Sequence, residues 1–127
     1  MNTIISAGSG GIACCYLKNW MMRTRSKYCA HDILAACDGI ICGLVAVTAV
    51  CNNCAAWEAF IIGILSCPVY VFAAMLLKKI GVDDPINAGA IHTSCGIWGL
   101  VAAGLFDNSK GAFSNNQGAA SGKFFGY

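Results

Sequence analysis

Apolar residues in this chain of 127 residues occur in long runs that short polar segments separate. A helix needs about 20 consecutive apolar residues to cross the hydrocarbon of a bilayer. The runs therefore predict an all-α fold, a polytopic transmembrane helix bundle with four spans. The expected spans cover about residues 3–17, 33–50, 55–77 and 86–106. The first span is the shortest, because its apolar run begins almost at Met1 and ends at residue 17.

The chain changes character after the fourth span. Residues 107–127 are rich in Gly, Ser, Asn and Ala and show no periodicity. This composition is typical of a loop that stays outside the hydrocarbon. We therefore expect a partial membrane domain over residues 1–106, followed by a non-cytoplasmic loop or truncated tail over residues 107–127.

Composition agrees with a membrane protein and argues against other classes. Hydrophobic residues make up 57% of the chain and charged residues 11%, whereas soluble domains contain about 25% charged residues. Eight Lys and Arg nearly balance six Asp and Glu, and no basic stripe alternates with aromatic residues. Binding to nucleic acid is therefore not expected.

Most of the nine cysteines lie inside apolar runs, where a free thiol behaves as a small buried hydrophobic group. Cys51 and Cys54 form the one close pair, and no second pair supplies the further ligands of a zinc or redox site. No metal and no cofactor are expected. No nucleophile, base and orienting group converge in the sequence either, so we do not expect an enzyme.

Basic residues predict the orientation, because Lys and Arg in short loops remain in the cytoplasm. Lys18, Arg23, Arg25 and Lys27 separate the first two spans, and Lys78 and Lys79 separate the last two. Both of these loops are predicted to be cytoplasmic. The amino terminus, the turn at residues 51–54 and the tail then lie on the other side.

The fourth span has a marked start and a helix face of small residues. Asp83, Asp84 and Pro85 precede it; an Asp accepts hydrogen bonds from first-turn amides, and Pro suits the first helical position. Such small-residue faces allow close helix packing, although ordinary packing is also a sufficient explanation. The face consists of Gly89, His92, Gly96, Gly99 and Ala103, and Gly39 and Gly43 form a similar pair in the second span.

His92 is the candidate functional residue, since an ionisable side chain inside a span is by default a functional hypothesis. A neutral imidazole offers one hydrogen-bond donor and one acceptor, which suits a narrow path for a small polar solute or a proton relay. The alternative is a histidine that bonds to a neighbouring helix and holds the bundle together. Asp38 lies about one and a half turns into the second span, where it reaches the interface or faces an aqueous cavity.

These residues resemble the ammonium transporter family. Residues 83–99 are similar to that family's Asp-Asp-Pro … His … Cys-Gly-x-Trp-Gly segment at matching spacing. Residues 39–49 (GIICGLVAVTA) and 56–63 (AWEAFIIG) resemble its neighbouring helices. The resemblance implies spans seven to ten of an eleven-span bundle that carries ammonium or ammonia across a membrane, most commonly the plasma membrane. For the full-length protein, the resemblance further implies a homotrimer in the lipid bilayer.

The resemblance also implies roles for individual residues. His92 matches the second of the family's paired pore histidines, Ala88 and Thr48 match positions near the path, and Asp84 matches a carboxylate that organises a helix start.

The chain departs from the family in single residues and in length. Thr93 replaces a usual Gly, Asn87 a common Asp, and Asp38 a usual uncharged residue. The first pore histidine and the outer recruitment site have no counterpart in this sequence. We therefore expect a truncated fragment that does not transport alone. The alternative is a small four-span membrane scaffold that binds partner helices without transport.

Overall fold

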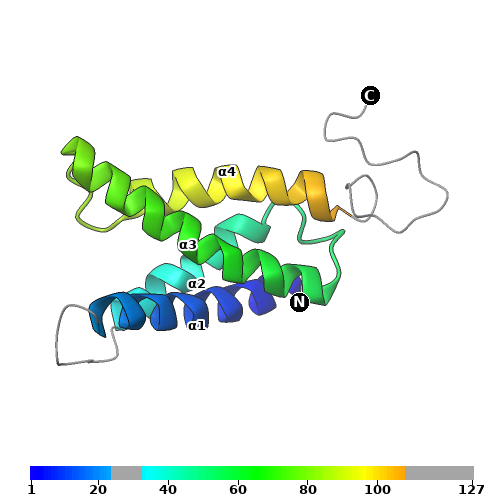
Figure 1. Cartoon of the computed structure of the whole chain (residues 1–127). Helices are drawn as coiled ribbons and strands as arrows, with labels where there is room; N and C mark the ends of the chain where they lie inside the picture. The colour runs from blue at the N-terminus through cyan, green and yellow to red at the C-terminus, as the bar shows by residue number, and fades with distance from the viewer. Residues whose placement is uncertain (24–32, 108–127) are drawn as a thin grey trace.

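The computed structural model of the chain describes residues 1–23 and 33–107. These residues form an all-α bundle, as predicted, with the helices α1 (Asn2–Arg23), α2 (Ile33–Val47), α3 (Ala56–Ile80) and α4 (Ala88–Phe106). Successive helices run antiparallel, so α1 and α3 point one way and α2 and α4 the other (Figure 1). The predictions for Arg25, Lys27 and the tail after residue 107 fall outside the described residues.

Two helix ends differ from the apolar runs. The first helix continues to Arg23 rather than ending near residue 17, because Lys, Met and Arg favour helix even where the chain is no longer apolar. The second helix ends at Val47 rather than at residue 50. There the Thr48 hydroxyl donates to the Val45 carbonyl over 2.6 Å, and the Val50 amide donates to Val47 over 3.1 Å. These bonds form a tight turn in place of the expected last helical turn.

Helices α2 and α3 occupy the centre of the bundle. Each of them contacts both of the outer helices, α1 and α4, whereas the described parts of α1 and α4 do not contact each other. Figure 1 shows α4 on the far side of α3 from α1. The four helices therefore form an open arrangement with two outer helices rather than a closed ring.

The interface of α1 and α2 is formed by backbone contact at glycines. A methyl group built on Gly39 would come within 2.5 Å of the Gly10 carbonyl oxygen, and one built on Gly43 would overlap the Ser6 carbonyl. The buried Ser6 hydroxyl donates to the Gly43 carbonyl over 2.8 Å. Small residues thus allow both close approach and an interhelical hydrogen bond, as in other membrane helix pairs.

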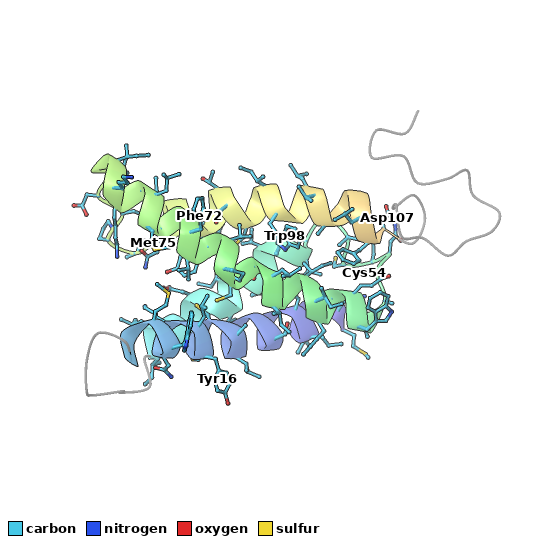
Figure 2. All side chains as sticks on the ribbon, in the orientation of Figure 1. Tyr16, Cys54, Phe72, Met75, Trp98 and Asp107 are labelled. Atoms are coloured by element: carbon cyan, nitrogen blue, oxygen red, sulfur yellow. The ribbon has the colours of Figure 1, made fainter. Side chains whose placement is uncertain are left out.

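Each helix also contributes one fully buried thiol to the core, namely Cys14, Cys42, Cys67 and Cys95. The four thiols belong to one cluster of buried residues, and the Cys95 thiol of α4 donates to the Ser66 carbonyl of α3 over 3.7 Å. In the same core the Trp98 indole nitrogen of α4 donates to the Ile62 carbonyl of α3 over 3.2 Å (Figure 2). Small side chains at the helix midpoints therefore let each outer helix pack closely against the central pair α2 and α3.

The outside of the bundle is apolar, as lipid requires. Ile4, Tyr16 and Leu100 are more than 70% exposed, at 76%, 74% and 71%, and Figure 2 shows Tyr16 extending away from the helices. Helices α3 and α4 are long and apolar enough to cross a membrane, and α2 is a shorter apolar helix. Such extensive exposed apolar surface marks contact with lipid or other helices.

The predicted orientation places the basic residues that follow the first and third spans on the same side of the membrane. Lys18 lies in the last part of α1, and Lys78 and Lys79 lie in the last turn of α3. Because α1 and α3 run in the same direction, these residues lie toward the same end of the bundle (Figure 1). That end also contains the start of α4.

The glycine contact between α1 and α2 yields the first testable prediction. We expect Gly43→Ala to lower the free energy of unfolding in detergent by about 1–3 kcal/mol, because the added methyl group forces the two backbones apart. Gly8→Ala is the matched control, since nothing lies within 4 Å of its added methyl group. That variant should be neutral or stabilising by up to about 1 kcal/mol. Equal effects of the two changes would contradict the packing argument.

Candidate functional site

His92 lies one turn into α4 with its side chain exposed. The buried face of this helix is formed by other residues, namely Ala90, Ile91, Cys95, Gly99 and Ala102. Among the residues that the structure describes, the imidazole has no hydrogen-bond partner. The side chain is therefore not used to hold these four helices together.

His92 lies on the flank of α4 that borders the interface between α2 and α4. These two helices are parallel neighbours, since Asn87 meets Asp38 at one end of the interface and Gly99 meets Ala46 further along. A methyl group on Gly99 would come within 2.8 Å of the Ala46 carbonyl oxygen. His92 lies about two turns before Gly99, or roughly 10 Å along the helix axis.

The glycines of the predicted small-residue face of α4 and of the predicted pair in α2 differ in their surroundings. Gly39, Gly43 and Gly99 lie against neighbouring backbones. By contrast, a methyl group on Gly89 would meet only the Asp84 carboxylate of the preceding turn, and one on Gly96 would meet nothing within 4 Å. Close packing is thus seen on the part of the face next to Ala46. For Gly89 and Gly96 it stays a prediction.

Ala88 lies near His92 on α4, whereas Thr48 lies at a different level of the bundle. Ala88 is the first residue of α4, one turn before His92, and is half-buried. Thr48 is exposed just after α2, where its hydroxyl donates to the carbonyl of Val45 in its own chain segment. It lies close to Ala46 in the chain, and Ala46 packs against Gly99. Thr48 is therefore at the level of Gly99 rather than at that of His92.

The start of α4 is organised by Asp84. Its carboxylate accepts a hydrogen bond from the Ala90 amide over 3.0 Å, and its carbonyl accepts one from the Asn87 amide over 3.2 Å. The helix begins at Ala88 rather than near residue 86. Asn87 has a left-handed backbone with φ 54°, and this conformation separates the turn at Pro85 from the helix. Asp83 is exposed beside this turn.

Asp38 forms a polar contact that sequence reasoning did not identify. Its carboxylate accepts hydrogen bonds from the Tyr70 hydroxyl over 2.8 Å and from the Asn87 amide group over 3.3 Å. The contact joins α2, α3 and the start of α4. The available signal was a carboxylate inside an apolar run, but the run does not reveal which residues lie opposite it.

The loop before α3 is held by Asn2. Its side-chain amide donates to the carbonyls of Cys51 and Cys54 over 2.9 and 2.7 Å. Burial, with a smaller effect of Glu58, raises the pKa of the Cys54 thiol, so the neutral form is favoured. In residues 1–23 and 33–107 no three His, Cys, Asp or Glu side chains are grouped to hold a metal ion.

A groove of about 500 Å³ lies between α3 and α4 but does not include His92. Its lining combines apolar residues of α3 with Thr93, Ser94 and Ile97 of α4, together with Asp83 and Asp84. The groove and the histidine thus occupy different flanks of α4. We therefore treat the His92 flank as the candidate site.

A family comparison and two relatives place this fold among transporters. The model of the Ammonium Transporter Family matches residues 1–126. A putative ammonium transporter of Synechocystis sp. is 34% identical over 109 residues, which are 86% of this chain and 24% of the relative. Ammonium transporter Amt2 of Archaeoglobus fulgidus is 29% identical over 126 residues, which are 98% of this chain and 26% of the relative.

Solved structures show the same likeness. Mep2 of Saccharomyces cerevisiae matches with a TM-score of 0.73 and 25% identity, over 91% of this chain and 24% of that protein. A Mep2 mutant of Candida albicans matches with a TM-score of 0.73 and 28% identity, over 95% of this chain and 29% of that protein. The chain thus spans about a quarter of the length of these relatives.

The bond between Asp84 and Ala90 can be tested by mutation. We expect Asp84→Ala to destabilise the start of α4 by about 1 kcal/mol, because a first-turn amide loses its side-chain acceptor. Faster hydrogen exchange at the Ala90 amide would report this loss. Asp83→Ala removes the same charge from an exposed neighbour and should leave that exchange rate unchanged. A similar increase in both variants would point to charge rather than to the hydrogen bond.

Proposed function

The chain belongs to the ammonium transporter family, and on this premise we propose that it supplies one wall of a path for ammonium or ammonia across a membrane. The family consists of transporters rather than enzymes, and the all-α bundle with apolar outer surfaces fits a membrane protein. Both relatives compared above are described as ammonium transporters, one of them putatively.

The exposed imidazole of His92 carries this proposal. It lies on an apolar helix at a flank that the described helices leave open, one turn after Ala88. A path through apolar surroundings penalises a hydrated cation, because its water shell has to be removed. A neutral imidazole can exchange hydrogen bonds with ammonia, since it both donates and accepts. We assign His92 and Ala88 to the wall of the path, and Thr48 to the same wall at the level of Gly99.

The path requires further helices. The described helices contact one another on one side of His92, and its own flank faces outward. Transporters commonly place the substrate site between two halves of the molecule. We therefore propose that this chain does not transport alone and that helices outside it close the path. A homotrimer in the plasma membrane is the assembly proposed for the completed protein.

A membrane scaffold without transport is the second candidate function. The observation in its favour is that α1 and α4 each have only two helix neighbours in the described chain, which leaves apolar outer faces for partner helices. In-membrane crosslinking would distinguish this function. Discrete complexes in cells that contain no other family member would support a scaffold, and dispersed monomers would count against it.

Growth of cells that lack ammonium uptake tests the path directly. We expect cells that express residues 1–127 to grow on low ammonium no better than cells with an empty vector. A chimera in which residues 1–106 replace the matching segment of the archaeal relative should restore growth. Growth of the first strain would refute the need for further helices. Failure of a correctly inserted chimera would remove the transport function.

The same chimera tests His92. We expect His92→Ala to lower ammonium uptake about tenfold or more, because a desolvated solute loses a hydrogen-bond partner. The matched control is Thr93→Ala, a neighbouring exposed residue that lines the groove on the other flank of α4. Its uptake should stay within about twofold of the unchanged chimera. Unaltered uptake and cation dependence in the His92 variant would exclude the assigned role.

A further inference from the structure

The contact of Asp38, Tyr70 and Asn87 does more than connect three helices. We propose that Asp38 is a positioning residue that sets the start and the rotation of α4, and through them the direction in which His92 points. The functional meaning of that direction depends on the proposed function, but the positioning itself can be tested without transport.

The contact is firmly anchored on the α3 side. Tyr70 is only 4% exposed, and its hydroxyl donates to the Asp38 carboxylate over 2.8 Å. The same carboxylate oxygen accepts the Asn87 amide over 3.3 Å. Hydrogen bonds to a charged acceptor are stronger than those between neutral groups. Asp38 therefore fixes Asn87 relative to both α2 and α3.

Asn87 is the residue at which the chain turns into α4. Its left-handed backbone ends the preceding turn, and its carbonyl accepts the Ile91 amide over 2.9 Å, which is the first helical hydrogen bond. Each residue advances a helix by about 100°. If α4 slipped by one residue relative to the Asp38 contact, His92 would rotate by about 100° and turn away from the open flank. Holding the side chain of Asn87 opposes such a slip.

The chemistry of the pair is specific. Tyr70 and Asn87 both donate, and a carboxylate at position 38 is purely an acceptor. Asp at both positions 38 and 87 would place two negative groups against each other. An Asn at 38 with an Asp at 87 keeps one acceptor and one donor in the opposite order. The contact thus pairs one carboxylate with one amide, and exchanging the two groups between positions 38 and 87 keeps this pairing.

Other charged groups near the start of α4 act on Asn87 from a different side. Lys78, Asp83 and Asp84 line a small cavity of about 80 Å³ together with Asn87. The Asp84 carboxylate is already bonded to the Ala90 amide. Asp38 does not line this cavity. A charge at position 87 would therefore meet Asp38 across the interface between α2 and α4 and Lys78 within the cavity, so both partners have to be tested.

The test uses the full chain in lipid nanodiscs with four variants. These are Asp38→Leu, Asn87→Asp, the double variant Asp38→Asn/Asn87→Asp, and Cys37→Ser as the matched control at an exposed neighbour of Asp38. Two readouts are measured: hydrogen exchange at the Ala90 and Ile91 amides, and the imidazole NMR signal of His92. Exchange at the buried Ser6 amide reports whether the α1–α2 contact is still formed.

We expect Asp38→Leu and Asn87→Asp each to speed exchange at Ala90 and Ile91 by about tenfold and to shift the His92 signal. The double variant should return both readouts to within about twofold of the unchanged chain, and Cys37→Ser should leave them unchanged. A general loss of stability would also speed hydrogen exchange at the Ser6 amide. The double variant, in which the carboxylate and the amide are swapped, would not rescue such a loss.

Two outcomes would overturn the proposal. The first is a double variant whose hydrogen exchange and His92 signal are no closer to those of the unchanged chain than the values of Asn87→Asp. This outcome includes the case in which Lys78 alone neutralises the new charge at position 87, so that Asn87→Asp has no effect. The second is an unchanged His92 signal in Asp38→Leu. Since neither readout involves ammonium, failure of the chimera to transport would leave this result intact, and failure here would leave the transport test intact.

Discussion

Backbone contact between α1 and α2 is the constraint on which the rest of the bundle depends. Gly39 and Gly43 allow the carbonyls of Gly10 and Ser6 to approach to a distance that no side chain would permit. Gly63 of α3 packs against the same part of α1, next to Ser6 and Ser9. Lipid offers little hydrophobic driving force between helices, so tight packing and hydrogen bonds have to hold them. The cost of glycine in a helix is offset here by contact area.

Contacts with the central pair α2 and α3 fix the position of α4. Tyr70 and Asp38 join the two central helices, and Asn87 and Gly99 attach α4 to α2 at two levels. The polar contact of Asp38 thus lies toward the end that carries Lys78 and Lys79, whereas small residues and thiols fill the middle. His92 lies between Asn87 and Gly99 along α4. Neither of these two contacts with α2 covers its side chain, which therefore stays exposed.

Long apolar runs were sufficient to predict the helices, because burial in lipid dictates their composition almost independently of their neighbours. The run that begins at residue 3 did not show that α1 continues to Arg23, since helix can continue where hydrophobicity ends. Periodicity placed His92, Gly96 and Gly99 on one face, but only Gly99 is buried. Spacing defines a face of a helix, whereas burial depends on how far the neighbouring helix extends. The partners of Asp38 were unpredictable for the same reason.

The buried thiols have a further consequence. Cys14, Cys42, Cys67 and Cys95 are inaccessible to water in the assembled bundle, whereas Cys37 is exposed. A water-soluble alkylating reagent can therefore reach the core thiol of a helix only after that helix has separated from its neighbours. Mass mapping of the labelled cysteines would then give the order in which the helices leave the bundle. The chain carries its own unfolding reporters, one in each helix, without any engineered label.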